Sequence, residues 1–305
     1  MAEPARWIDL LDPTRDELVA AAPVELDPRA LGQLLAPHVA GREPRPALEG
    51  RRDYVLGVLL APVAEPARDR LFYQEVDFVL TAECLVTVRK TPAGDPPFEP
   101  AAIREVLARH PSRSTADAVH ALVDEVAERY LDVVESLDDE IDELEERIEE
   151  WPSERVRARL SALRHDLLHV RVTLSPTRDA VRRVVDGRLD AGGGEVFPRA
   201  VELSFADAHD KLLRAAESLD LARDLLASAR DHQQARIAHE QNEVVKKLTV
   251  TASLLLVPTF IVGVYGQNFE HLPELGWGLG YGFSWAVIIV STLAQLAFFR
   301  WKGWL

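Results

Sequence analysis

Two long runs without a charged residue lie near the C-terminal end of this chain. Residues 248–264 form a run of 17 and residues 277–299 a run of 23. As helices they would extend roughly 25 and 35 Å, because an α-helix rises 1.5 Å per residue. A bilayer core of about 30 Å needs about 17 to 25 apolar residues. The two runs therefore predict a transmembrane hairpin within residues 248–305.

The first run is the more polar of the two, since it contains Pro258 and several hydroxyl side chains. It also fits the buried core helix of a soluble protein, an interpretation that the neighbouring second run makes less favourable. Proline and hydroxyl groups within a span are tolerated where the helix faces protein or water. We therefore expect the first span to lie against protein or an aqueous space rather than lipid alone.

The charges that flank the two runs predict their orientation. Lys246 and Lys247 precede the first run, Arg300 and Lys302 follow the second, and residues 265–276 contain no lysine or arginine. Lysine and arginine are enriched on the cytoplasmic side of membrane proteins. The N-terminal residues show no signal region of charged and then apolar residues. We expect an integral plasma (inner) membrane protein with two spans and with both chain ends in the cytoplasm.

Composition excludes several classes of function. The chain has 35 Lys+Arg against 50 Asp+Glu, a net charge of −15, whereas a nucleic-acid binder needs a basic face. Its single cysteine, Cys84, excludes a disulfide framework and a multi-cysteine zinc site. No phosphate-binding loop, nucleophile elbow or clustered His/Asp pair is visible in the N-terminal part. We expect neither an enzyme nor a bound cofactor.

Residues 1–115 are predicted to form a cytoplasmic α/β domain. Apolar and β-branched runs indicate strands at residues 6–11, 53–61, 72–80 and 83–90. Asp12 followed by Pro13 resembles an N-cap and first-turn pair that opens a helix over residues 13–22. A second short helix is expected over residues 98–110.

Residues 116–247 are predicted to form a bundle of long helices and a stalk. Apolar residues recur there three and four positions apart, as in helices that pack through narrow seams. Residues 151–153 and 190–195 supply two turns. The last helix has no breaker between Phe205 and Pro258, so it is expected to continue into the membrane.

Residues 132–150 hold eleven acidic side chains and one basic side chain, Arg147. The simplest interpretation is the solvated face of a helix. The functional interpretation is a diffuse reservoir that raises the local concentration of cations. Carboxylates on one rigid helix do not converge into a cage, so they would bind hydrated metal weakly.

Residues 242–275 resemble the pore helix and signature loop of the CorA-type magnesium transporters, a family with two transmembrane helices and a Gly-x-Asn motif. Members carry Tyr-Gly-Met-Asn-Phe, a short loop with Met-Pro-Glu-Leu, a second span and a basic tail ending in Trp-Leu. Here the corresponding segments are 265–269, 272–275 and the tail "FRWKGWL". A weaker likeness extends through the N-terminal part, so the resemblance covers nearly the whole chain in order.

The resemblance implies a homopentameric funnel that moves hydrated Mg²⁺, with Co²⁺ or Ni²⁺ as accompanying ions. The fold class expected is therefore an α/β cytoplasmic domain, a long helical stalk and two C-terminal transmembrane helices. In this family the first spans line a central pore. The expected partners are further copies of the chain, membrane lipid and divalent cations.

Gly266 and Asn268 are the positions to which the resemblance assigns ion selectivity. Magnesium loses its water reluctantly, so a filter for it should offer hydrogen-bond acceptors to coordinated water. Rings of Gly266 carbonyl and Asn268 side-chain oxygens would do so, and glycine lets the backbone bend or approach closely there. The alternative is a simple turn that happens to contain glycine and asparagine.

The other residues of the signature loop have supporting roles in this interpretation. Tyr265 and Phe269 are expected to pack and hold the loop in place. Glu270 and Glu274 would attract cations at the entrance, or alternatively serve only to solvate the loop.

A pore-lining face can be counted back from the loop at the helical period. It comprises Asn242, Val245, Leu248, Thr249, Ala252, Leu256, Thr259 and Gly263. Within this set Val245, Leu248 and Leu256 would form an apolar constriction, which can gate a pore by dewetting. Thr259 and Asn242 would offer rings of oxygen atoms.

Asp231 lies eleven residues before Asn242 on the same face of the expected helix. In the family, an acidic residue at this stalk position helps to bind intracellular divalent metal between protomers. Bound ion would hold the ring of subunits closed and its loss would loosen them. The alternative is a solvated aspartate on the stalk surface.

Gln267 departs from the family pattern, because it replaces the usual methionine with an amide. Branches of the family with another residue here include zinc transporters, so this position leaves the metal open. Three hypotheses follow: a passive Mg²⁺-selective channel, a Zn²⁺ transporter of the same fold that is proton-coupled, and a membrane-anchored sensor or scaffold that does not conduct.

Overall fold

The computed structural model describes residues 6–65, 70–109, 114–189, 196–267 and 276–304. The chain divides into two compact units, Met1–Arg230 and Asp231–Leu305. We call them the N-terminal unit and the C-terminal unit and describe each by itself.

The N-terminal unit contains, within its described residues, a five-stranded sheet in the order β1-β5-β4-β3-β2. The strands are β1 (Arg6–Leu11), β2 (Ala47–Gly50), β3 (Val55–Glu65), β4 (Arg70–Leu80) and β5 (Cys84–Arg89). β1 runs parallel to β5, and the other neighbours are antiparallel. All four predicted strands are confirmed, whereas β2 was not predicted because it is short and follows a proline-rich stretch.

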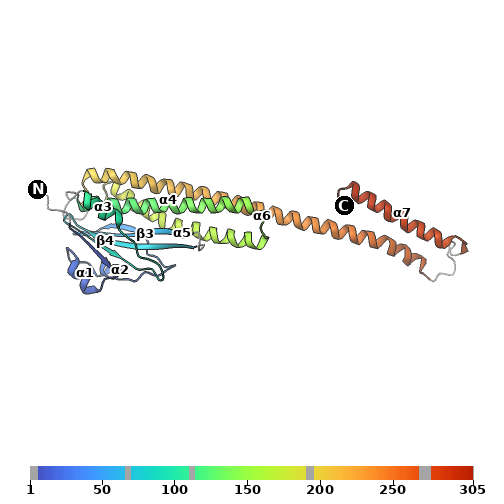
Figure 1. Ribbon diagram of the computed structural model, residues 1–305, viewed down its shortest axis with the longest axis horizontal. Coiled ribbons are helices and arrows are strands. Elements are labelled where there is room, and N and C mark those ends of the chain that lie inside the picture. The colour runs from blue at the N-terminus through green and yellow to red at the C-terminus, as the bar shows by residue number, and fades with distance from the viewer. Residues whose placement is uncertain (1–5, 66–69, 110–113, 190–195, 268–275, 305) are drawn as a thin grey trace. The chain divides into compact units, whose positions relative to one another are not determined.

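Helices cover both faces of this sheet (Figure 1). On one face lie α3 (Ala101–Arg109) and α4 (Thr115–Arg147), and on the other α1 (Arg15–Ala21) and α2 (Pro28–Leu34). Successive side chains of a strand point to opposite faces of the sheet, so each strand contributes to two separate hydrophobic clusters. Phe78 joins the cluster with α4, whereas Val79 joins the cluster with α1 and α2.

The start of α1 corrects the predicted N-cap. Thr14 caps the helix, and it forms a capping box in which Glu17 contributes the reciprocal bond. Asp12 instead has a positive φ of 46° and accepts hydrogen bonds from Thr91. The expected Asp-Pro start is found at the unpredicted helix α2, where Asp27 caps the helix and Pro28 is its first residue.

Three long helices confirm the predicted seams. They are α4, α5 (Ser153–Val185) and α6 (Arg199–Tyr265), which has 67 residues. Every predicted apolar seam position of α4 is buried, and so is every one of α6 between Phe205 and Ala229. Pro152 lies in the predicted turn, while the turn at 190–195 lies outside the described residues. Pro258 does not end α6, which continues for two further turns.

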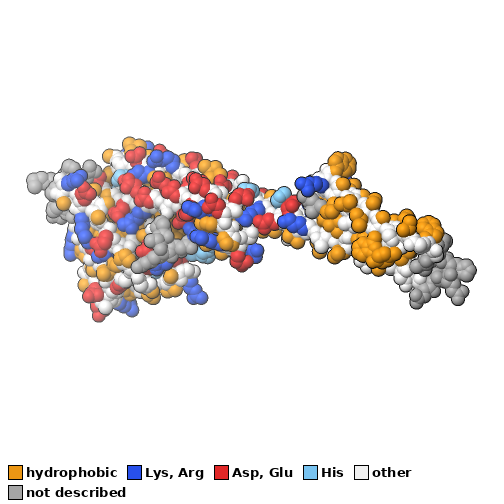
Figure 2. Space-filling model, turned by 45° about the vertical axis from the view of Figure 1, so that its right-hand side comes forward, with side chains coloured by type: hydrophobic (Ala, Val, Ile, Leu, Met, Phe, Trp, Pro, Cys, Tyr) orange, Lys and Arg blue, Asp and Glu red, His pale blue; other side chains and the backbone are white. Residues whose placement is uncertain are grey.

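The C-terminal unit comprises the last part of α6 and α7 (Gly280–Trp301). Both helices are long and apolar enough to cross a membrane, and their apolar stretches are almost entirely exposed in the single chain. Figure 2 shows hydrophobic side chains covering this unit and charged ones spread over the N-terminal unit. Surface of this kind needs lipid or another protein surface against it.

Position 57 requires glycine because β3 and β4 are in close contact there. Gly57 lies opposite Phe78, and a Cβ atom at position 57 would come within 2.1 Å of the fully buried Phe78 ring. We predict that Gly57→Ala lowers the free energy of unfolding by about 1–3 kcal/mol, as overpacking does. Thermal unfolding of the purified chain tests this. Gly32→Ala is the control, because Gly32 is helical with open space around it and alanine there should be neutral or stabilising.

Candidate functional site

The eight predicted pore-lining residues all lie on the exposed surface of α6 in the single chain. Between them, Val250 is buried and Val257 and Ile261 are half-buried. The transmembrane part of α6 therefore has one covered side and one open side. The open side also includes Leu255 and Phe260, so it is wider than the predicted face.

Hydroxyl groups on this part of α6 donate their protons to the helix backbone. Thr249 Oγ1 donates to the carbonyl of Val245 at 2.8 Å, and Thr259 Oγ1 donates to the carbonyl of Leu255 at 2.7 Å. The remaining lone pairs of each oxygen face outward as acceptors. Water bound to a divalent cation presents only hydrogen-bond donors, so these threonines match a hydrated cation.

The C-terminal end of α6 adds a negative partial charge at the predicted filter. Gly266 donates its backbone N–H to the Val262 carbonyl at 2.9 Å, and Gln267 donates to the Val264 carbonyl at 3.3 Å. The final carbonyls of a helix carry the negative end of its dipole. Gly266 has no positive φ, but a Cβ there would lie 3.1 Å from the Val262 oxygen. Glycine is thus favoured by the close approach of this carbonyl.

The rest of the signature loop is only partly described. Tyr265 is the last residue of α6 and Gln267 is exposed. Asn268, Phe269, Glu270 and Glu274 lie outside the described residues.

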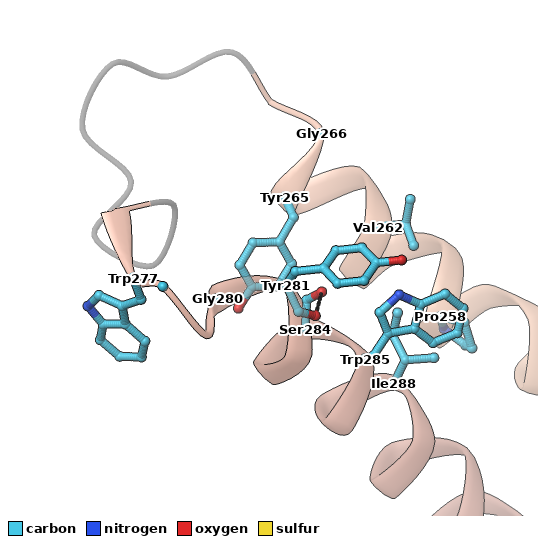
Figure 3. A pocket seen from close by; sticks show the side chains of 11 residues that line it. Pro258, Val262, Tyr265, Gly266, Trp277, Gly280, Tyr281, Ser284, Trp285 and Ile288 are labelled. Carbon is cyan, nitrogen blue, oxygen red and sulfur yellow. Dashed lines mark hydrogen bonds between the residues drawn. The ribbon is translucent and has the colours of Figure 1, made fainter.

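A cavity of about 790 Å³ lies between the ends of α6 and α7, directly beside Gly266 (Figure 3). Tyr265 and Tyr281 cross its middle and Trp285 lies below them. Neither Tyr281 nor Trp285 was among the site residues predicted from the sequence. The spacing of four between them was the available signal, because it places both on one face of α7. The packing of side chains around this cavity therefore affects the position of Gly266.

Asp231 is exposed on α6. Within the described residues, no group of three or more His, Cys, Asp or Glu side chains comes together in a geometry that would hold a metal ion. A metal site at Asp231 would therefore need ligands from another copy of the chain.

The acidic residues 132–150 lie mostly on α4, which ends at Arg147. Several are used within the chain, since Glu140 pairs with Arg159 and Arg147 lies near Glu143. Burial raises the pKa of Asp138, and the neighbouring carboxylates add to this rise. The helix thus presents partly neutralised carboxylates rather than a converging set of ligands.

The tail after α7 folds back on the helix in a Schellman motif. Gly303 has φ 68° and donates to the Arg300 carbonyl, while the Trp304 N–H donates to the Phe299 carbonyl at 2.9 Å. The Phe299 and Trp304 rings stack with centroids 5.9 Å apart. The tail is thereby an ordered end to the second span, with Lys302 beside the aromatic residues.

Comparison with known proteins agrees with this arrangement. The family described as CorA-like Mg²⁺ transporter protein matches residues 3–301. The cobalt/magnesium transport protein CorA of Thermotoga maritima is 30% identical over 86% of this chain and 73% of its own length. The chain therefore belongs to the CorA-like Mg²⁺ transporter protein family. Members of this family are membrane transporters or channels, and the chain is accordingly not an enzyme.

Solved structures confirm the fold. The complete structure of the CorA magnesium transporter from Methanocaldococcus jannaschii superimposes with a TM-score of 0.80 at 21% identity, covering 98% of this chain and 91% of that one. The ZntB cytoplasmic domain from Vibrio parahaemolyticus gives a TM-score of 0.57 at 16% identity, covering 78% of this chain and 91% of that one. The mixed sheet, the long helices and the two apolar C-terminal helices are thus the fold of this family.

The tail motif yields a prediction about Gly303. We expect Gly303→Ala to cost about 1–2 kcal/mol locally, because a Cβ disfavours the left-handed conformation. Hydrogen–deuterium exchange should then show lost protection of the Gly303 and Trp304 amides. Gly282→Ala on α7 is the matched control, since Gly282 has open space and no positive φ. Unchanged protection in Gly303→Ala would contradict the motif's role.

Proposed function

We propose that the chain assembles into a homopentameric channel that passes hydrated divalent cations, with Mg²⁺ as the first substrate and Co²⁺ or Ni²⁺ as accompanying ions. The observation that carries this proposal is the open side of α6. It displays outward-facing acceptor oxygens and ends in helix carbonyls at Gly266. Copies of α6 around an axis would turn that side into a pore and cover its apolar surface at the same time.

The path of the ion follows from the chemistry of that face. Asn242, Thr249 and Thr259 would form rings of oxygen acceptors for coordinated water. Val245, Leu248 and Leu256 would form apolar rings, and a constriction of this kind closes by dewetting when it narrows. Ala252 and Gly263 continue the same face without adding bulk.

The filter in this proposal lies at the mouth of the pore. The α6 carbonyl ends of several copies would meet there, and their dipoles would all point their negative ends at the ion. Asn268 would add amide oxygens to the Gly266 carbonyls, and Glu270 and Glu274 would raise the cation concentration outside. Such a ring binds the hydrated ion without stripping its water, in keeping with the reluctance of Mg²⁺ to dehydrate.

The orientation is part of the proposal. Both chain ends would lie in the cytoplasm of a plasma (inner) membrane, since Lys246, Lys247, Arg300 and Lys302 flank the spans on one side. The α/β domain of residues 1–115 and the bundle of residues 116–247 would then face the cytoplasm. There Asp231, which is exposed and belongs to no group of three or more potential metal ligands among the described residues, would share a regulatory metal with a neighbouring subunit.

A zinc transporter of the same fold, coupled to protons, is the second candidate. The observation that favours it is Gln267, which places an amide where the magnesium-transporting relatives carry a thioether. The likeness to the ZntB cytoplasmic domain supports the shared fold but not the metal, because identity is only 16%.

Reconstitution into proteoliposomes tests the proposed function. We expect Mg²⁺ uptake that Asn268→Ala lowers on the order of tenfold or more, since a hydrogen bond to a charged group contributes about 1.5–3 kcal/mol. Gly266→Ala should also lower it, whereas Gly276→Ala, with open space around it, should not. Gln267→Met tests whether this position sets the preference for Mg²⁺ over Zn²⁺.

Each other outcome of that experiment contradicts the proposal in a distinct way. Zn²⁺ uptake that depends on a pH gradient, without Mg²⁺ uptake, would establish the second candidate. No uptake of either ion would establish a non-conducting sensor or scaffold.

The proposed regulation predicts an effect of Asp231→Ala. Mg²⁺ should protect the wild-type protein from limited proteolysis, because bound ion holds subunits together. The variant should need a higher Mg²⁺ concentration for the same protection. Asp224→Ala is the matched control, as Asp224 is an exposed aspartate on the same helix. Equal titrations for wild type and Asp231→Ala would remove the regulatory role.

A further inference from the structure

Four titratable side chains are buried together where α2 covers the sheet of the N-terminal unit. Lys90 Nζ lies 2.5 Å from Glu75 Oε1 and 2.8 Å from Asp77 Oδ2. His38 Nδ1 lies 3.2 Å from Glu75 Oε2. The side chains of all four residues are at most 5% exposed. We call these residues the buried cluster.

The buried cluster is also attached to the end of α2. Lys90 Nζ donates a hydrogen bond to the carbonyl of Gln33 at 2.9 Å, in the last turn of that helix. Glu75 and Asp77 come from β4, and His38 follows α2 in the chain. The ammonium group of Lys90 therefore links α2 to β4, and His38 adds a further contact to β4 through Glu75.

The charges of the cluster do not balance when both carboxyl groups are ionised. Two carboxylates then face a single ammonium, with the imidazole of His38 as the fourth group. An uncompensated charge away from water is costly, and a buried group takes up or releases a proton instead. One bound proton makes the cluster neutral.

The contacts indicate which group holds that proton. Glu75 has a partner for each oxygen, Lys90 for Oε1 and His38 for Oε2. Asp77, by contrast, has no hydrogen-bond donor for either oxygen among the described residues, and only its Oδ2 lies within ion-pair distance of Lys90. Asp77 is therefore the carboxylate whose negative charge is less well compensated.

We propose that the buried cluster is a proton-binding site, in which a proton on Asp77 keeps α2 seated on the sheet and loss of that proton loosens α2. The site lies outside the ion path of the proposed function and does not depend on it. It would make the packing of the N-terminal unit respond to the pH around it.

The electrostatics agree in direction with this assignment. Burial raises the pKa of Asp77 to about 7; Lys90 opposes the rise and Glu75 adds to it. Burial lowers the pKa of Lys90, but Asp77 and Glu75 outweigh that effect and leave it raised. The lysine thus stays charged while the aspartic acid holds a proton up to near neutral pH.

The sign of the pH dependence follows from linkage. The closed state holds a proton that an opened, solvated Asp77 would release above the ordinary aspartate pKa of 3.8. Raising the pH from there through about 7 therefore favours opening of α2. The opening equilibrium should rise about tenfold per pH unit in this window and level off above it.

Hydrogen–deuterium exchange of the full-length chain in detergent tests this proposal. After correction for the intrinsic exchange rate, the amides of residues 28–38 should lose protection between pH 5 and 7 and change little above. Asp77→Asn should remove that dependence and leave α2 protected throughout. Asp53→Asn is the matched control, because it removes the same charge from an exposed position before β3.

The same experiment separates Asp77 from His38. His38→Gln should keep the wild-type pH dependence, since glutamine still donates to Glu75 but holds no proton. A pH dependence that survives in Asp77→Asn, or vanishes in His38→Gln, overturns the proposal. Infrared spectroscopy provides a check that needs no variant. The wild-type chain should show the carbonyl stretch of a protonated carboxylic acid that titrates near neutral pH, and its absence would also overturn the proposal.

Discussion

Exposed apolar surface on the C-terminal unit is the constraint on which the rest of this protein depends. Leu248, Leu256 and Phe260 are each about 70% exposed in the single chain, and many large apolar side chains of α7 are exposed as well. A water-soluble chain could not keep such surface open. Lipid can cover part of this surface, but lipid tails offer no hydrogen-bond donors to the threonine oxygens and helix-end carbonyls on α6. The proposed ring of copies around water would satisfy both demands.

The N-terminal unit handles polar groups differently. Its sheet is covered on both faces, so Glu75 and Asp77 on β4 have almost no access to water. Glu75 has direct hydrogen-bond partners in Lys90 and His38, while neither oxygen of Asp77 has a hydrogen-bond donor among the described residues. This is the type of arrangement in which a proton takes the place of a missing counter-charge.

The local signals were reliable where one face of an element had to be buried. Apolar and β-branched runs indicated β3, β4 and β5, and the three- and four-residue spacing indicated α4, α5 and α6. Prediction failed where only a short element or a cap was involved. Asp12-Pro13 and Asp27-Pro28 are alike in sequence, yet only the second begins a helix. Asp12 instead accepts a hydrogen bond from Thr91, which is distant in the sequence. No local sequence pattern reveals that contact.

The sequence by itself determined the family of this protein, its two apolar C-terminal helices and the order of its long helices. The hydrophobic runs and the loop around Gly266 consist of residues adjacent in the sequence, so they can be recognised from the sequence alone. Only the tertiary structure decided which polar groups still need hydrogen-bond partners or counter-charges. Two features depend on atoms brought together in space. One is the set of acceptor oxygens on Thr249 and Thr259, and the other is the buried cluster of Lys90, Glu75, Asp77 and His38. Burial and hydrogen bonding, rather than position in the chain, decide what those atoms can do.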